Sequence, residues 1–256
     1  MEVSNMLRIR PTRSLAMLIS MIALTHSVIA ETKHYIAPYT STKKSLESTT
    51  PEMALQNLMA GNMRFITKKV IHRNLSNQAI VTSLKGQFPS ALVLSCMDSR
   101  GTPEMILDQG IGDIFTVRLA GNVIDSDQLA GIEYATKIVG TKLIIIMGHT
   151  QCGAVLGACQ NVKLGNLTQL LDKIQPAIND IRNKQDGKLD CSDSKTIDLI
   201  AKKNVLHMMQ AITENSPIVM DLVNNKQVMI VGAMQNINSG KVTFFDGTGK
   251  EITAKK

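Results

Sequence analysis

Two short runs along the chain are almost entirely apolar: Ala91–Ser95 and residues 143–147. Strands that are buried on both faces of a parallel sheet have such continuous runs, and we expect the second strand to begin at residue 142. Another strand is expected at 113–117. Segments 227–233 and 241–245 are predicted to pair as a hairpin, because the turn-forming residues Asn238, Ser239 and Gly240 lie between them.

Segments with helical periodicity surround these strands. The clearest begins at Thr50, which can cap a helix whose first position suits Pro51. Further helices are predicted at 76–85, 103–107, 127–139, 152–161, 166–183 and 194–214, with a short one after Pro217. The alternation of strands and helices predicts an α/β fold in one domain over residues 49–250. Its central, mainly parallel sheet would be flanked by helices and would carry an antiparallel hairpin at one edge.

The first 30 residues have the three-part pattern of a secretory signal peptide. Three arginines between positions 8 and 13 precede the apolar stretch 15–24, and small or branched residues lead to a cleavage position after Ala30. The alternative is an uncleaved membrane anchor. This alternative is disfavoured, because a membrane span needs about 20 apolar residues and polar residues interrupt the stretch before that length. Residues 31–48 are polar and lack periodicity, so we expect them to form a flexible N-terminal arm.

The charge distribution and the cysteine count argue against a nucleic-acid-binding protein and against a disulfide-rich scaffold. The formal net charge is +7, but Lys and Arg are scattered, without a basic run or an aromatic-interleaved patch, so we expect no nucleic-acid partner. Four cysteines are too few for a disulfide scaffold in a chain of 256 residues. Cys159 and Cys191 either form one disulfide or remain free thiols, and the sequence leaves both alternatives open.

Cysteine and histidine side chains follow two of the predicted strands at the point where each strand ends. Cys96 comes directly after the first apolar run, and His149 and Cys152 follow the second. Because ligands bind at the carboxyl ends of parallel strands, we expect the three side chains to meet there. Two thiolates and one imidazole are a donor set of catalytic zinc, which keeps a fourth position open. The sequence therefore predicts one Zn²⁺ per chain, held by Cys96, His149 and Cys152.

Asp98 and Arg100 lie beside this predicted zinc site. On extended backbone, a spacing of two residues places both side chains on the same side, so Arg100 can hold the carboxylate through charge-assisted hydrogen bonds. A carboxylate fixed there would accept a hydrogen bond from a zinc-bound hydroxide and orient it. The alternative is an ordinary salt bridge at a strand end, and the spacing alone does not separate the two interpretations.

Together, the segments Cys96-x-Asp98-x-Arg100 and His149-x-x-Cys152-Gly153 resemble the signature of the β-class carbonic anhydrases. The resemblance extends over residues 55–245 and includes motifs at 117–122, 132–135 and 204–205. It implies a carbonate dehydratase that reversibly hydrates carbon dioxide to bicarbonate and a proton. In such an enzyme zinc-bound hydroxide would attack carbon dioxide, with Asp98 and Arg100 orienting the hydroxide.

The resemblance also implies which residues contact the substrate. Gln87 and the backbone N–H of Gly153 would contact its oxygens, and Phe115 and Tyr134 would line the pocket, which in relatives lies at a dimer interface. From the sequence alone, these two aromatic residues fit a plain core role equally well. Gly101 stands where the family usually has an apolar residue. The resemblance further implies a homodimer or dimer of dimers, and the export signal adds a location in a bacterial periplasm.

Members of the family also have a closed state, in which Asp98 would leave Arg100 and become a fourth zinc ligand. Some relatives favour that state through a bicarbonate site of Trp, Arg and Tyr. Here only Arg118 is kept, with Val93 and Gln235 at the other two positions, so we expect an open site near neutral pH. Two other functions stay open: hydrolysis of carbonyl sulfide or carbon disulfide on this scaffold, and non-catalytic binding of zinc or bicarbonate, which the intact Asp98–Arg100 pair disfavours.

Overall fold

The computed structural model describes residues 40–254, which contain a five-stranded sheet in the order β2-β1-β3-β4-β5. Strands β1 to β4 are parallel, and β5 runs antiparallel to β4 at one edge. The strands are β1 Ala91–Ser95, β2 Ile114–Arg118, β3 Leu143–His149, β4 Met229–Gln235 and β5 Val242–Phe245. The predicted α/β fold with a mainly parallel sheet and an edge hairpin is confirmed.

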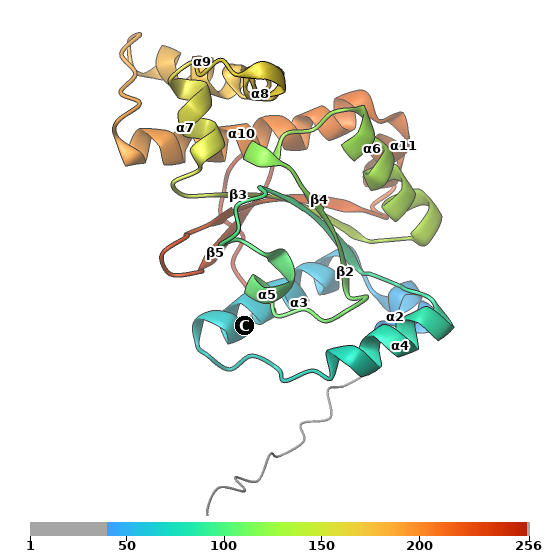
Figure 1. Cartoon of the computed structure of the whole chain (residues 1–256). Helices are drawn as coiled ribbons and strands as arrows, with labels where there is room; N and C mark the ends of the chain where they lie inside the picture. Colours follow the sequence, from blue (N-terminus) through green and yellow to red (C-terminus); the bar gives the residue numbers. More distant parts are fainter. Residues whose placement is uncertain (1–39, 255–256) are drawn as a thin grey trace, which may run out of the picture. The chain divides into compact units, whose positions relative to one another are not determined.

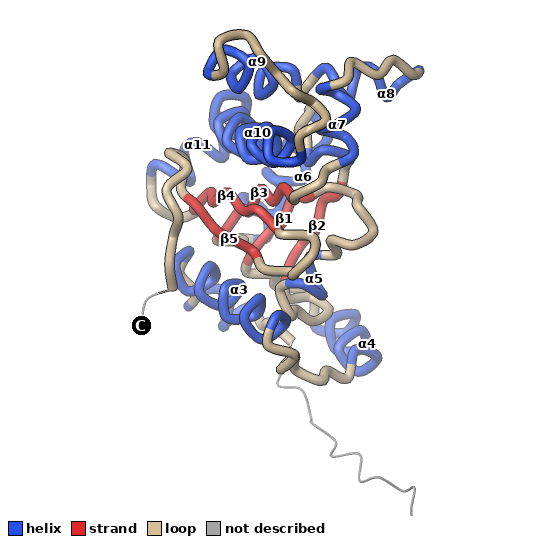
Figure 2. Tube along the Cα trace, turned by 90° about the vertical axis from the view of Figure 1, so that its left-hand side faces the viewer, coloured by secondary structure: helices blue, strands red, loops and turns tan. Residues whose placement is uncertain are grey.

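Helices cover both faces of this sheet (Figures 1 and 2). One face carries α3 Pro51–Ile66 and α5 Pro103–Ile106, with α2 Lys43–Ser48 and α4 Leu75–Lys85 on the same side. The other face carries α6 Ser126–Glu133, α7 Gly153–Cys159, α8 Gly165–Asp172, α9 Gln175–Lys184, α10 Ser194–Asn215 and α11 Pro217–Asn224. None of the helices within residues 40–254 combines the length and the apolar character that crossing a bilayer requires.

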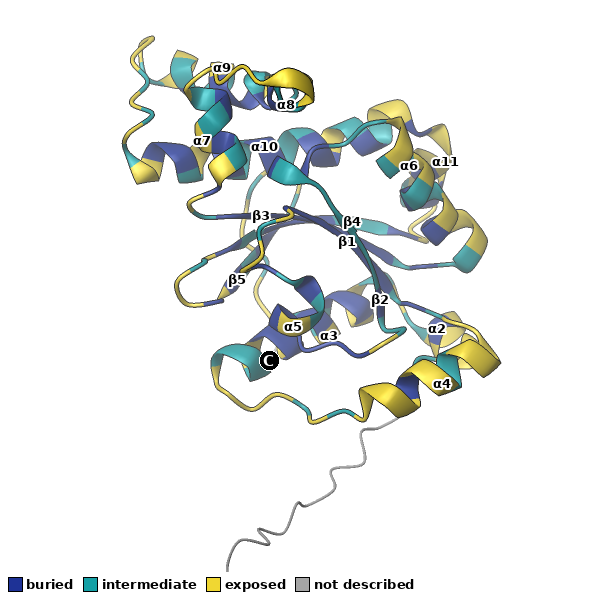
Figure 3. Cartoon of the chain, viewed as in Figure 1, coloured by how far each residue is buried: buried dark blue, intermediate teal, exposed yellow. Residues whose placement is uncertain are grey.

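Alternate side chains of β1 and β3 enter two separate hydrophobic cores. Leu92, Leu94 and the matching residues of β3 pack with α6 to α11, whereas Val93 and Ile145 pack against α3 and α5. Both strands are therefore buried along their whole length, as their dark blue colour in Figure 3 shows. This two-sided burial explains why their sequences are apolar at successive positions rather than at alternate ones.

The expectation of a flexible arm over residues 31–48 is wrong for the part that the structure describes. Thr42 caps α2 in a capping box with Ser45, and Leu46 is buried. Just before this helix, the hydroxyl of Ser41 donates to Asp113. Residues 43–48 contain a single large apolar residue, so no periodicity marks them in the sequence. The predicted signal peptide and residues 31–39 lie outside the described residues.

Two predicted helices differ in detail from the observed ones. The segment 166–183 is interrupted, and α8 and α9 replace it. Pro176, in the first turn of α9, has no N–H to offer the carbonyl of Asp172, so one helix cannot continue through this point. The predicted helix 127–139 changes at Tyr134–Val139 into a π-helix that ends at Gly140, whose φ is 90°.

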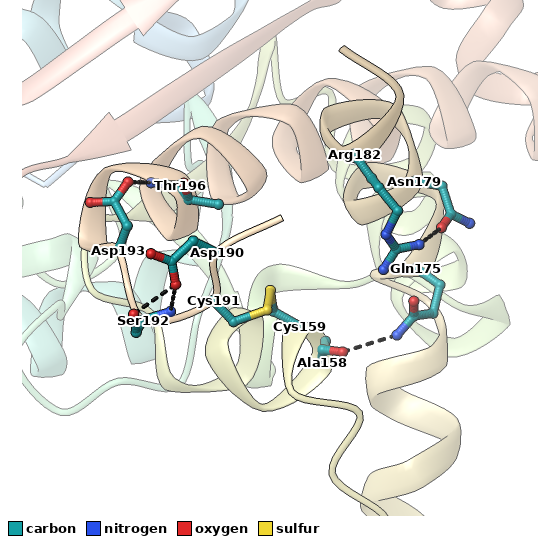
Figure 4. Close-up of a disulfide and its surroundings, with 10 residues drawn as sticks. All are labelled: Ala158, Cys159, Gln175, Asn179, Arg182, Asp190, Cys191, Ser192, Asp193 and Thr196. Atoms are coloured by element: carbon teal, nitrogen blue, oxygen red, sulfur yellow. Dashed lines mark hydrogen bonds between the residues drawn. A yellow bond between two sulfur atoms is a disulfide. The ribbon is translucent and has the colours of Figure 1, made fainter. Parts of the chain in front are cut away.

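Cys159 and Cys191 form a disulfide, with 5.8 Å between their Cα atoms, which decides between the two alternatives that the sequence leaves open. The bond joins the last residue of α7 to the loop that precedes α10 (Figure 4). Gln175 donates to the carbonyl of Ala158 beside it, at 3.1 Å. The disulfide and this hydrogen bond thus tie α7 to the segments around it.

Candidate metal centre

The geometry of neighbouring parallel strands brings the predicted zinc ligands together. Ser95, the last residue of β1, is paired with Met147 of β3, and β3 continues to His149. Cys96 directly follows β1 and therefore lies at the same edge of the sheet as His149. Gln151 takes a left-handed backbone conformation with a φ of 57° and turns the chain into Cys152, the residue that precedes α7.

Cys96, His149 and Cys152 meet as predicted. Their potential ligand atoms all lie within 4.8 Å of one another. The three residues are 7%, 3% and 1% exposed, respectively. Within residues 40–254 they are the one group of three or more Cys, His, Asp or Glu side chains that meets this geometric condition for a metal.

The orientation of His149 fits a metal ligand. Its Nδ1 lies 2.9 Å from the carbonyl oxygen of Thr150, so the proton of the neutral ring is placed on Nδ1. Nε2 is buried and has no hydrogen-bond partner in the described part of the chain. An unpartnered buried nitrogen is costly, and a zinc ion between Nε2 and the two sulfur atoms would satisfy it. The residues present therefore fit zinc.

The two sulfur atoms share a local environment that favours a negative charge. The contact with Cys152 and, to a smaller extent, the hydrogen bond from the backbone N–H of Gly121 lower the pKa of Cys96 against the opposing effect of burial. The same contact with Cys96 raises the pKa of Cys152. Cys96 is thus the more acidic of the two thiols, and binding of a divalent cation would release the proton that remains on Cys152.

Asp98 and Arg100 form a bidentate pair at the edge of this centre. Arg100 Nε donates to Asp98 Oδ1 at 2.9 Å and Nη2 donates to Oδ2 at 2.8 Å, while the backbone N–H of Arg100 donates to Oδ1 at 3.0 Å. The Arg100 side chain holds the pKa of Asp98 well below its usual range. Asp98 Oδ2 also lies 4.0 Å from His149 Nε2. The carboxylate is therefore beside the candidate zinc position and engaged by Arg100.

The structure adds a contact of Arg118 that the sequence does not reveal. Its Nη2 donates to the carbonyl of Asp98 at 2.6 Å, and its Nε donates to the carbonyl of Cys96 at 3.3 Å. Arg118 follows Val117 on β2 and is paired in register with Ser95, which places its side chain beside the end of β1. The segment that carries Cys96 and Asp98 is thus held from the neighbouring strand.

Gly101 and Gln235 are in close contact next to this segment. Gln235 ends β4, pairs in register with His149 and is 2% exposed. A Cβ atom on Gly101 would lie 2.8 Å from Gln235 Oε1. The carboxamide of Gln235 therefore occupies the space that a side chain at position 101 would need.

Three of the predicted substrate-contacting residues lie away from the metal centre of the same chain. Phe115 pairs with Leu92, four residues before Cys96, which corresponds to about 13 Å along the strand. Tyr134 lies beside Phe115, with 6.4 Å between the ring centroids. Gln87 precedes β1 altogether and is exposed. Gly153, in contrast, directly follows Cys152.

Comparison with known proteins decides the family. A family model described as carbonic anhydrase matches residues 91–242. A solved β-carbonic anhydrase from Aspergillus fumigatus shares 28% identity with a TM-score of 0.60, covering 67% of this chain and 82% of that one. The chain belongs to the β-class carbonic anhydrases. It is therefore an enzyme of the carbonate dehydratase type.

Two other carbonic anhydrases are similar to this chain over most of its length. Carbonic anhydrase 2 of Mycobacterium tuberculosis is 30% identical over 209 residues, which are 80% of this chain and 97% of that protein. A tetrameric β-carbonic anhydrase from Sordaria macrospora shares 25% identity with a TM-score of 0.60, covering 70% of this chain and 90% of that one.

Proposed function

We propose that the chain is a zinc-dependent carbonic anhydrase whose catalytic groups are Asp98 and Arg100. The observation that carries this proposal is the buried Cys96–His149–Cys152 group with a clamped carboxylate beside it. Zinc held there would supply hydroxide at neutral pH, because coordination lowers the pKa of water to about 7. A purely structural zinc site has four protein ligands, and it needs no positioned carboxylate.

Asp98 would act as a hydrogen-bond acceptor that orients the attacking oxygen. A carboxylate whose pKa is held low by Arg100 stays ionised and can only accept. Because both of its oxygens bond to Arg100, its position is fixed before carbon dioxide arrives. The backbone N–H of Gly153, next to Cys152, would donate to an oxygen of the substrate.

We also propose that the site is completed by a second copy of the chain. Gln87, Phe115 and Tyr134 cannot reach the metal centre of their own chain, but a partner subunit could present them to it. Exposed apolar side chains near these residues support such a contact: Leu84 is 79% exposed, Ile138 is 72% exposed and Tyr134 is 53% exposed. Ile138 and Gln87 also line the same cavity of about 330 Å³.

Near neutral pH the resting enzyme would be in the open state, in which Asp98 bonds to Arg100 and does not ligate the metal. Asp98 is engaged by Arg100, and the guanidinium of Arg118 is engaged by two backbone carbonyls. An anion that recruited Arg118 would therefore have to break these bonds.

The disulfide supports the proposed export, because disulfides persist in oxidising compartments such as the periplasm.

Zinc analysis combined with stopped-flow carbon dioxide hydration tests the proposed function. We expect one zinc per chain and rapid hydration for the wild type, and loss of both in Cys96→Ala and in His149→Ala. Cys191→Ser, a cysteine change outside the site, is the matched control and should keep its zinc. Hydration that persists in a zinc-free variant would refute the proposed mechanism, and zinc binding without hydration would leave a non-catalytic metal site.

A further inference from the structure

A left-handed turn lies directly against the thiolate side of the candidate metal centre. Gly121 has a φ of 68° and Asn122 has a φ of 45°. The backbone N–H of Gly121 donates to Cys96 Sγ at 3.4 Å. A side chain at position 121 would be strained, because the backbone is left-handed and a Cβ there would lie 2.8 Å from Ile174 Cδ1 and 3.3 Å from Ala154 Cβ. This turn therefore supplies a hydrogen bond to a metal ligand from an unusual backbone geometry.

Asn204 holds this turn from a distant element. It lies on α10, is fully buried at 0% exposure, and its Nδ2 donates to the carbonyl oxygen of Gly121 at 2.9 Å. Gly121 thus donates its N–H to Cys96 and accepts from Asn204 with its carbonyl. Asn204 Oδ1 and, on the residue after Gly121, Asn122 Nδ2 are buried without a hydrogen-bond partner in the described residues.

We propose that Asn204 is a positioning residue for the metal ligand Cys96. By fixing the carbonyl of Gly121, it keeps the Gly121 N–H directed at the sulfur. Hydrogen bonds to a ligand atom orient the ligand and tune how strongly it donates to the metal. The inference rests on the proposed function only in taking Cys96 as a zinc ligand.

A second buried asparagine provides a comparison within the same chain. Asn62 on α3 is 3% exposed and bonds to the carbonyls of Ile106 and Gly240 and to the N–H of Val242. It joins α3 to α5 and to the β4–β5 hairpin on the opposite face of the sheet. Loss of Asn62 should therefore destabilise the fold without changing the metal ligands.

The test compares Asn204→Leu with Asn62→Leu in the full chain. Cobalt(II) replaces zinc as a spectroscopic probe, and the sulfur-to-cobalt charge-transfer band and the zinc affinity from chelator competition are measured. We expect Asn204→Leu to shift this band and to weaken zinc binding by about 10- to 100-fold. Asn62→Leu should lower the melting temperature but keep the wild-type band and affinity. Asn204→Ala, a smaller change that creates no overpacking, should show the same direction as Asn204→Leu.

Two outcomes would overturn the positioning role of Asn204, and a third would overturn the metal centre itself. Wild-type band and affinity in either folded Asn204 variant would overturn the positioning role. Equal spectral changes in Asn62→Leu would overturn it as well, because they would make the effect one of general destabilisation. If the wild-type protein bound neither cobalt nor zinc, the proposed metal centre itself would fail, independently of Asn204.

Discussion

Three neighbouring side chains surround Asp98. Arg100 binds both carboxylate oxygens, Arg118 holds the carbonyl of Asp98, and His149 lies 4.0 Å away. Because the folded-state pKa of Asp98 is lowered, the pair contributes stability above the ordinary carboxyl pKa of about 3.9. That contribution is lost as the pH falls through the lowered value. Asp98 thus stays ionised at every pH at which the enzyme would work.

The contact between Gly101 and Gln235 predicts an energetic coupling. Gly101→Ala places a Cβ 2.8 Å from Gln235 Oε1 and should lower the free energy of unfolding by about 1–3 kcal/mol, as overpacking does. In a Gln235→Ala background the same change should cost much less. Denaturant unfolding of the four proteins in a double-mutant cycle measures this coupling. Additive effects would show that the two side-chain positions do not compete for space.

At the scale of single residues, the sequence predicts the zinc ligands but not the groups that hold them. Cys96, His149 and Cys152 carry recognisable chemistry at strand ends, and the structure brings them together as expected. Arg118 and Asn204 act on backbone carbonyls, which every residue possesses, so no side-chain pattern identifies their partners. One feature of the sequence does indicate the left-handed turn: the pair Gly121–Asn122, because Gly and Asn tolerate a positive φ.

At the scale of elements, a buried carboxylate joins three segments on the α3 face of the sheet. Asp108 follows α5, and its side chain is 3% exposed. It accepts from Arg64 of α3, and from Arg73, which precedes α4, at 2.5 Å. Burial opposes its ionisation, but the hydrogen bonds from Arg64 and Arg73 outweigh burial and lower its pKa. The stabilisation is therefore present above about pH 4 and is lost as the pH falls below the lowered pKa.

Asp108→Asn should accordingly destabilise the protein in a pH-dependent way. Breaking a buried ion pair costs about 3–5 kcal/mol, and Asn tolerates the left-handed backbone at this position, where φ is 47°. Urea unfolding at pH 7 and at a pH well below 4 should give a smaller difference between variant and wild type at the lower pH, because the charge interaction is lost only as the pH falls below the lowered pKa of Asp108. A difference that does not depend on pH would contradict the assigned charge interaction.

The disulfide predicts a second effect at this scale. Cys159 and Cys191 are 32 residues apart, and a loop of this length corresponds to a stabilisation of about 3–4 kcal/mol in the loop-entropy model. Replacing both cysteines by serine should lower the free energy of unfolding by that amount and leave the zinc content unchanged, because Cys152 is placed by β3. Calorimetry with zinc analysis measures both quantities. Loss of zinc from the folded double variant would show that the disulfide supports the metal centre.

The sequence predicts a strand well where both of its faces are buried, and a helix well where recognisable capping residues mark its start. The runs of β1 and β3 and the Thr50–Pro51 helix start match the observed positions. Helix α2 could not be predicted, because its only buried residue is Leu46 and its capping box involves Ser45 rather than a glutamate. The break between α8 and α9 follows from Pro176, which periodicity alone does not weigh.

At the scale of the whole molecule, the proposed active site is shared between two chains. Coexpression of a Cys96→Ala chain with a Gln87→Ala chain tests this requirement. In the mixed dimer, the Gln87→Ala chain supplies the metal centre and the other chain supplies Gln87, so one complete site forms. We expect hydration activity above that of either variant alone. If mixing recovers no activity, Gln87 does not act from a partner subunit.

The most direct test of the central claim is the rate of carbon dioxide hydration by Asp98→Asn. The change keeps the shape of the side chain but removes the charge that Arg100 binds and one acceptor for the attacking oxygen. Stopped-flow measurement at equal zinc content should show a loss of at least about 100-fold in kcat, as removal of a positioned catalytic group does. Wild-type turnover by a zinc-loaded Asp98→Asn enzyme would contradict the role assigned to the Asp98–Arg100 pair.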